Sequence, residues 1–270
     1  MYELFNVSGK VVVITGGTGV LGASMVEYLA RHKAKVVVLA RNKDKGDKLI
    51  NKVLSDGGEA MFLVTDVNNK EVLEKNKKDI LGRYKKIDIL INGAGGNMPG
   101  ATIGPDKTIF DLNIDDFKTV VDLNLIGTVL PSIVFGSCMI EQKKGSIINI
   151  SSEAALRPLT RVVGYAAAKA AVTNFTKFLS IELATKFGEG LRVNAIAPGF
   201  FITEQNRTLL TNIDGSYTER GQAIISHTPF GRFGEPEELL GALHWLASDA
   251  SKFVTGTLTI VDGGFDAFCV

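Results

Sequence analysis

The amino-acid sequence predicts an α/β fold, a doubly wound parallel sheet of seven strands with helices on both faces. Short apolar runs rich in valine and isoleucine alternate with longer amphipathic stretches along the chain. The runs are apolar throughout, rather than at every second residue, which indicates strands that are covered on both faces. Strands and helices that alternate in this way form parallel βαβ units with right-handed crossovers in one sheet.

Each element is predicted from its own local pattern. The strands are the β-branched runs KVVVIT (10–15), AKVVVLA (34–40), EAMFLVT (59–65), IDILING (87–93), GSIINIS (145–151), LRVNAIA (191–197) and TLTIVD (257–262). The helices are the amphipathic stretches between them, at about 20–32, 42–56, 69–84, 115–142, 164–187 and 235–249.

Two connections are longer than such a fold requires, at about 94–114 and 198–236. Both are expected to leave the carboxyl ends of strands, where ligands bind in open α/β sheets. Long loops at that edge are more often functional than structural. We therefore expect these two loops to hold the substrate.

Length and composition indicate one dinucleotide-binding catalytic domain over residues 1–270. The chain is 45% hydrophobic and carries a formal net charge of +1, which favours neither nucleic acid nor an anionic membrane as a partner. Cys138 and Cys269 have neither metal-type nor redox-type spacing, and the absence of a His/Cys/Asp cluster predicts no catalytic metal. No signal peptide is visible, and no apolar run approaches the roughly 18 residues of a membrane span, so we expect a cytoplasmic protein.

The segment TGGTGVLG at 15–22 follows the first strand and opens onto the first helix. Read from Gly17, it is a G-x-G-x-x-G dinucleotide fingerprint; read from Thr15, it is nearly T-G-x-x-x-G-x-G, with Val20 in place of the middle glycine. In both readings the main chain approaches a pyrophosphate at a helix N-terminus, whereas the alternative is a merely structural turn. The coenzyme contacts expected here are Gly16, Thr18, Gly19, Val20, Leu21 and Gly22.

The end of the second strand bears on the choice of coenzyme. An NAD site usually carries an acid about 20 residues further on, which binds the ribose 2′-hydroxyl. Here Ala40 and Arg41 occupy that place, and the first acid is Asp44. Arg41 suits a 2′-phosphate, although a solvated arginine at a helix start is the alternative. We expect NADP to be preferred and NAD to be possible, with Asp66 either accepting from the adenine amine or starting a helix.

Four residues suggest hydride-transfer chemistry. Tyr165 and Lys169 lie four apart on one helix face. A phenol acts as a base at neutral pH only if its phenolate is stabilised by about 3 pKa units, roughly 4 kcal/mol, which a neighbouring ammonium and an oxidised nicotinamide favour. Ser152 ends the fifth strand and either donates to the reacting oxygen or only terminates the strand. Asn124 lies in a predicted helix, where asparagine is unfavourable; it is either a satisfied polar residue or the holder of a water linked to Lys169.

Together, in this order and spacing, these motifs resemble the short-chain dehydrogenase/reductase family over essentially the whole chain. The resemblance implies a Rossmann-type fold and favours reading the glycine loop from Thr15. It implies Tyr165 as acid/base, Lys169 as ribose holder and pKa modulator, Ser152 as the carbonyl-orienting residue and Asn124 as the proton-relay residue. Further coenzyme contacts that it implies are Val67, Asn92, Ala94, Gly95, Tyr165, Lys169, Pro198, Gly199, Phe201 and Thr203.

Two further expectations depend on this resemblance. Val20 departs from the family's glycine and is expected to push the loop or the first helix slightly away from the pyrophosphate, with Gly19 compensating by bending the loop. The family commonly forms tetramers through its long helices, which implies a homotetramer formed by the stretches 115–142 and 164–187.

Within the family, INGAGGN, the insertion after it, DLNLIGT and the stretch from IAPGFFITEQNR to HTPFGRFGEPEELLG resemble the D-mannonate oxidoreductase group. This implies interconversion of D-fructuronate and D-mannonate. A substrate with a carboxylate and many hydroxyls requires an arginine and several amides, although loop arginines are commonly only solvated. The candidates for substrate binding are Asn97, Arg161, Gln205 and Arg207, with Arg157, Glu204 and Asn206 nearby.

Two other functions stay open on the sequence. One is another sugar or polyol dehydrogenase, such as an enzyme that acts on gluconate. The other is a non-catalytic nucleotide-sensing protein on the same fold. The second predicts the loss of at least one of the four catalytic candidates, and all four are present.

Overall fold

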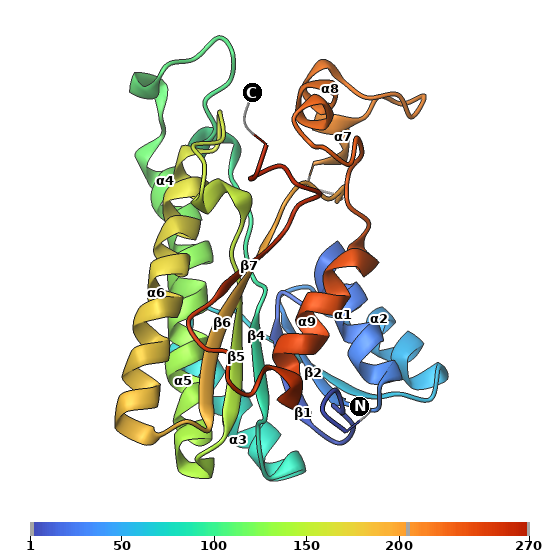
Figure 1. Ribbon diagram of the computed structural model, residues 1–270, viewed down its shortest axis with the longest axis vertical. Coiled ribbons are helices and arrows are strands. Elements are labelled where there is room, and N and C mark those ends of the chain that lie inside the picture. The colour runs from blue at the N-terminus through green and yellow to red at the C-terminus, as the bar shows by residue number, and fades with distance from the viewer. Residues whose placement is uncertain (1–2, 204–205, 269–270) are drawn as a thin grey trace.

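A computed structural model describes residues 3–203 and 206–268, and its centre is a seven-stranded parallel sheet (Figure 1). The strand order is β3-β2-β1-β4-β5-β6-β7, and every neighbouring pair is parallel. All seven predicted strands are confirmed, with ends that differ by at most two residues. The strands are β1 (Val11–Thr15), β2 (Lys35–Ala40), β3 (Glu59–Val64), β4 (Ile89–Asn92), β5 (Gly145–Ile150), β6 (Leu191–Pro198) and β7 (Leu258–Val261).

Helices cover both faces of the sheet, as the sequence predicts (Figure 1). Helices α1, α2 and α9 pack on one face, and α3, α5 and α6 pack on the other. The strand β1 shows why: Val12 and Ile14 join the core on the first side, whereas Val11 and Val13 join the core on the second. The helices are α1 (Val20–Arg31), α2 (Lys43–Ser55), α3 (Lys70–Tyr84), α4 (Ile114–Val121), α5 (Gly127–Gln142), α6 (Val163–Phe187), α7 (Arg207–Leu210), α8 (Glu219–Ser226) and α9 (Leu240–Ala247).

The stretch predicted as one helix at 115–142 is interrupted. A π-helical turn, Asp122–Ile126, joins α4 to α5 and carries the buried Asn124. Such single wide turns inside α-helices are frequent at functional sites. The continuous segment Ile114–Gln142 is also long and apolar enough to cross a membrane by length and composition alone. The expectation that no apolar stretch reaches this length is therefore wrong. Just over half of the most apolar 18 residues of this segment are buried inside the fold.

The predicted loop at 198–236 contains two short helices, α7 and α8, which lie beyond the carboxyl ends of the strands (Figure 1). Thr218 starts α8, because its Oγ1 accepts a hydrogen bond from the Gly221 amide at 3.1 Å. Ile224 and Ile225 pack with Leu210 and Phe233 into a small separate apolar cluster. This region thus forms a structured cover over one end of the sheet, with a core of its own.

Candidate functional site

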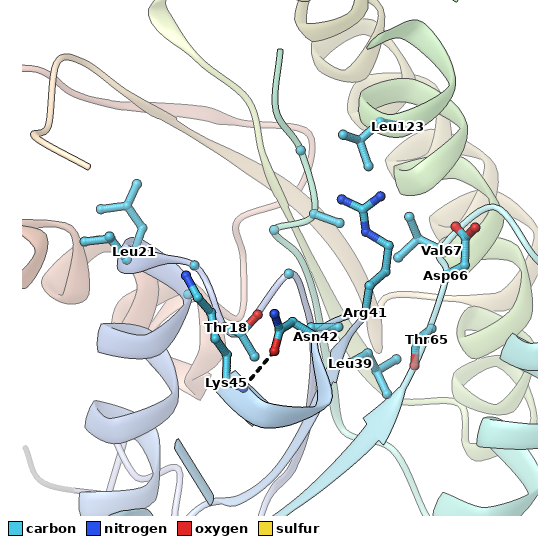
Figure 2. Close-up of a pocket in the computed structure, with 18 of the residues that line it drawn as sticks. Thr18, Leu21, Leu39, Arg41, Asn42, Lys45, Thr65, Asp66, Val67 and Leu123 are labelled. Carbon is cyan, nitrogen blue, oxygen red and sulfur yellow. Dashed lines mark hydrogen bonds between the residues drawn. The ribbon is translucent and has the colours of Figure 1, made fainter. Parts of the chain in front are cut away.

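A cavity of about 430 Å³ opens at the carboxyl ends of β1, β2, β3 and β4. The strand order reverses between β1 and β4, and a doubly wound sheet binds its ligand at such a reversal. Figure 2 shows the hollow with the side chains around it. Of the residues expected to contact the coenzyme, it is lined by Gly16, Thr18, Gly19, Val20, Leu21, Gly22, Arg41, Asp66, Val67, Ala94, Gly95 and Thr203.

The glycine loop has no side chains where the main chain after β1 approaches the main chain after β4 and the start of α1. Gly16 has a φ of +68°, and a Cβ there would lie 2.6 Å from the Gly93 carbonyl oxygen. A Cβ on Gly22 would lie 2.5 Å from the Gly16 carbonyl oxygen. Because Gly19 is the N-cap of α1 and provides no side-chain cap, the first amides of this helix are left for an anion. This cradle therefore fits a pyrophosphate.

Val20 is the first residue of α1 and lines the cavity. Gly19 has a φ of −75°, which any residue adopts, so the turn that requires glycine is at Gly16. Whether Gly19 compensates for Val20 by bending the loop stays a prediction. Whether Val20 shifts the pyrophosphate stays a prediction.

The side of this cavity next to the end of β2 carries basic side chains. Arg41 is exposed at the end of β2, and Figure 2 shows it reaching toward Leu123 with Asp66 and Val67 on the same side. Asn42 and Lys45 follow on the cavity wall. Asp66 also lines the cavity. It accepts a hydrogen bond from the Asn68 amide at 3.0 Å, which stabilises the turn after β3.

A second cavity, of about 350 Å³, adjoins the first. The two share Leu21, Gly93, Gly95 and Thr203 on their walls. The catalytic candidates Ser152, Tyr165 and Lys169 line the second cavity, as do Pro198, Gly199 and Phe201. The two cavities thus adjoin each other between the glycine loop and the predicted catalytic residues.

Lys169 is held in place by the end of β5. Only 3% of the residue is exposed, and Nζ donates a hydrogen bond to the Ile150 carbonyl oxygen at 2.7 Å. Nζ also lies 5.6 Å from the centroid of the Tyr165 ring. Burial lowers the pKa of the Lys169 ammonium to about 8, so at neutral pH the side chain is mostly protonated.

Tyr165 stands in the first turn of α6, beside Ser152. Burial raises the pKa of the phenol above its ordinary value, and a hydrogen bond with Ser152 acts in the opposite direction with a smaller effect. The phenol is therefore neutral at neutral pH. Ser152 is fixed as the N-cap of a short 3-10 turn, Glu153–Ala155, where Oγ accepts from the Ala154 amide at 3.2 Å.

Asn124 is fully buried in the π turn and binds the loop after β4. Its Nδ2 donates to the Gly96 carbonyl oxygen at 2.7 Å, and its Oδ1 accepts from the Gly96 amide at 3.2 Å. A Cβ on Gly95 would lie 2.7 Å from Asn124 Oδ1 and 3.4 Å from Lys169 Nζ. Asn124, Gly95 and Lys169 are thus close neighbours, and the Asn124 side chain is satisfied by Gly96 and Val120. A role for Asn124 in a proton relay stays a prediction.

Asn92 occupies a different place from the one expected of a coenzyme contact. Only 1% of it is exposed, and its Nδ2 donates to Ser132 Oγ at 2.9 Å and to Asn149 Oδ1 at 2.8 Å. The side chain therefore ties β4 to β5 and α5 beneath the cavities, outside the described walls of both.

The substrate candidates are separated by the structure. Asn97 lines the second cavity. Arg161 and Arg207 are exposed and lie outside the walls described for that cavity. Arg157 forms an ion pair with Asp266, with Nε 3.0 Å from Oδ1. Gln205 and Glu204 lie outside the described residues, and Asn206 lines the cavity while binding the main chain of Phe201 and Thr203.

Two charged residues on the wall of the second cavity, Arg220 and Glu153, were not among the candidates predicted from the sequence. Arg220, in the first turn of α8, reaches the cavity from the covering helices. Glu153 is 1% exposed, and neither carboxyl oxygen has a hydrogen-bond partner among the described residues. Burial, followed by the charges of Asp262 and Asp266, raises the pKa of Glu153 to about 7, and Arg157 opposes this shift. The capping threonine that opens TERGQAII was the available signal for α8; nothing in the sequence pointed to the burial of Glu153.

Groups of His, Cys, Asp and Glu that would hold a metal ion are not found within residues 3–203 and 206–268. The expectation of a metal-free site stays a prediction.

Comparisons with known proteins agree with this geometry. The family model of short chain dehydrogenases matches residues 10–214. An oxidoreductase of Bacillus subtilis named UxuB, of uncharacterised activity, is 46% identical over 97% of both chains. A Haemophilus influenzae protein provisionally named D-mannonate oxidoreductase, solved with NAD bound, is 40% identical, with a TM-score of 0.91 over 98% of this chain and 97% of its own.

A third protein extends the comparison to another substrate. The provisionally named NAD(P)-dependent gluconate 5-dehydrogenase of Beutenbergia cavernae, solved with NADP, is 29% identical, with a TM-score of 0.86 over 98% of this chain and all of its own. The two solved structures each cover 98% of this chain, whereas the family model ends before β7. This chain therefore belongs to the short-chain dehydrogenase/reductase family, whose fold binds NAD(P).

Proposed function

We propose that this protein is an NAD(P)-dependent reductase of sugar-acid ketones, and that it interconverts D-fructuronate and D-mannonate. The observation that carries the proposal is the second cavity, where Ser152, Tyr165 and Lys169 share the wall with polar groups for a hydroxylated, anionic substrate. Those polar groups are Asn97, Asn206 and the half-buried Arg220. The similarity to the Haemophilus influenzae protein supports the same substrate class.

The protonation states favour the reductive direction. When bound, the nicotinamide coenzyme supplies or accepts the hydride. The neutral phenol of Tyr165 is ready to give its proton to the oxygen of a ketone, and Ser152 orients that oxygen by a hydrogen bond. The protonated Lys169, fixed by the Ile150 carbonyl, stabilises the phenolate that remains and holds the ribose hydroxyls. Asn124 fixes the loop after β4 beside Lys169, where a bound water would link Lys169 to solvent and carry the returning proton.

For the coenzyme, we propose a preference for NADP, with NAD also used. Arg41 follows β2 where an NAD site usually carries an acid, and the wall continues with Asn42 and Lys45. One solved relative contains NAD and another contains NADP, so the family fold itself is compatible with both.

The direct test follows the loss of reduced-nicotinamide absorbance with D-fructuronate, with NADH and NADPH in separate reactions. We expect rapid turnover, faster with NADPH. Coenzyme binding without turnover of D-fructuronate would contradict the mannonate assignment. Turnover of 5-ketogluconate in its place would favour the gluconate-type alternative, which the Beutenbergia cavernae structure supports.

We also propose a single catalytic domain that assembles as a homotetramer through the long helices. Large apolar side chains on α5 and α6 point outward, with 60% of Ile133, 63% of Phe178 and 65% of Ile181 exposed. Helix faces of this kind are suited to an interface between subunits. Sedimentation equilibrium tests this, and a monomer at micromolar concentration would contradict it.

A further inference from the structure

Arg220 places a positive charge on the wall of the second cavity. The residue is half-buried on α8, and its one hydrogen bond given by the described residues runs from Nη2 to the Thr160 carbonyl oxygen at 3.4 Å. None of the ion pairs formed within residues 3–203 and 206–268 involves Arg220. A half-buried guanidinium usually has an anionic partner, because its desolvation is otherwise uncompensated.

A second arginine makes this charge less favourable still. The charge of Arg161 acts on Arg220 and, after burial, is the next cause that lowers the pKa of Arg220. Arg161 itself has a φ of +78°, a left-handed conformation that is uncommon for a residue with a Cβ. The turn is held there because the Arg161 carbonyl oxygen accepts a hydrogen bond from the Ile103 amide at 2.9 Å. The structure therefore keeps the charge of Arg161, outside the cavity walls, close enough to act on Arg220, which lies on them.

The position of Arg220 on its helix adds to the same imbalance. Arg220 is the second residue of α8, and cations are unfavourable in the first turn of a helix because of the helix dipole. Burial, a second arginine and the helix dipole all disfavour the charge in the free protein. An anion bound between the two arginines relieves all three effects at once.

We infer that Arg220, assisted by Arg161, is the residue that recognises the carboxylate of the sugar-acid substrate. This inference rests on the proposed function, because it assigns the acid group of that substrate to one end of the second cavity. The ketone of the substrate then lies at the opposite end of this cavity, beside Ser152 and Tyr165. Arg220 comes from the covering helix α8, whereas Ser152 and Tyr165 come from the sheet and α6, so the substrate spans the two parts of the protein.

The experiment compares an acid with its neutral counterpart. D-fructuronate and D-fructose have the same ketone and differ in a terminal carboxylate. For Arg220→Gln we expect kcat/KM for D-fructuronate to fall about 100-fold, mainly through KM, while kcat/KM for D-fructose changes less than about 3-fold. Arg161→Gln should lose about 5- to 10-fold for the acid alone. Arg220→Lys should recover part of the loss, since it restores the charge without the fork geometry.

Lys107→Gln is the matched control, because it removes one exposed positive charge from the other long loop, outside the described cavity walls. It should leave both substrates unchanged within about 2-fold. Unaltered discrimination between acid and neutral ketone in Arg220→Gln would overturn the inference. An equal fall for both substrates would also overturn it, since that points to a structural role.

A binding measurement separates this inference from the proposed function. With coenzyme present, D-gluconate should raise the melting temperature of the wild-type protein more than D-glucitol does, and Arg220→Gln should abolish the difference. If the wild-type protein shows this difference but does not turn over D-fructuronate, the proposed substrate is wrong and the carboxylate site stands. If D-fructuronate is turned over and the difference is absent, the carboxylate site is wrong.

Discussion

Asn124 binds Gly96 through both ends of its side-chain amide, with Nδ2 2.7 Å from the carbonyl oxygen and Oδ1 3.2 Å from the amide nitrogen. The contact joins the π turn to the loop after β4, next to Lys169. The neighbouring residue Gly95 has no room for a side chain, because a Cβ would lie 2.7 Å from Asn124 Oδ1. The loop, the asparagine and the lysine therefore form one fixed unit.

This close packing gives the first prediction. Gly95→Ala should lower kcat/KM about 100-fold, because the new methyl group displaces Asn124 or the loop and misplaces Lys169. Steady-state kinetics measure the loss, and circular dichroism checks that the fold is intact. Gly104→Ala in the same long loop is the control, since nothing lies within 4 Å of a Cβ there. Equal activity of the two variants would show that the unit is not required.

The second prediction concerns the acid of the reaction. Tyr165→Phe should lower kcat at least 1000-fold, roughly the upper part of the range for general acid catalysis, and leave the dissociation constant of the coenzyme within about 3-fold. Stopped-flow or steady-state assays give kcat, and fluorescence titration gives the binding constant. Tyr217→Phe, outside the described cavity walls, should behave as the wild type. Retained turnover in Tyr165→Phe would assign the proton to another group.

The third prediction concerns the coenzyme. Arg41→Ala should raise KM for NADPH about 10- to 100-fold and change KM for NADH less than about 3-fold, because only NADPH has a 2′-phosphate. Lys43→Ala is the control, since Lys43 is exposed nearby, pairs with Asp47 and is not on the described wall of the cavity. Similar changes for both coenzymes would contradict a role for Arg41 in selecting NADP.

The fourth prediction follows from the buried Glu153. Its pKa rises from 4.5 to about 7 on folding, so its favourable contribution is complete below pH 4.5 and is lost as the pH rises through 7. Glutamine has no charge to bury. Between pH 5 and pH 9, the free energy of unfolding of Glu153→Gln should therefore rise relative to the wild type by roughly 3 kcal/mol.

Urea unfolding at several pH values measures this difference. The exposed Glu237→Gln should show the same pH dependence as the wild type. Parallel curves for Glu153→Gln and the wild type would mean that the buried carboxyl finds a partner that keeps it ionised.

The sheet could be predicted from the sequence because its strands are buried on both faces and are apolar at every position. Interruptions of regular structure are harder to foresee. A π turn adds one residue within a stretch that remains helical and apolar, so the pattern over 115–142 gave no sign of it. The helices α7 and α8 have four and eight residues, too short for a helical period to stand out.

The candidate site was predicted only in part, because only some of its residues belong to local sequence motifs. Ser152, Tyr165 and Lys169 follow local motifs, and the structure brings them to one cavity. Substrate contacts depend on how distant loops fold over the sheet, which local patterns do not encode. The sequence therefore pointed to Arg161 and Arg207, which lie outside the described walls of the second cavity, and it did not single out Arg220, which lies on them. The burial of Asn92 below the cavities was also not foreseen.

The π turn also limits how the gene can change in length. A deletion of one codon within 122–126 would permit an uninterrupted α-helix, but it would remove the widened turn that carries Asn124. The two bonds of Asn124 to Gly96 depend on that turn, so the deletion would break the contact with the loop after β4. Insertions and deletions should therefore be excluded from this segment during evolution even where substitutions are accepted.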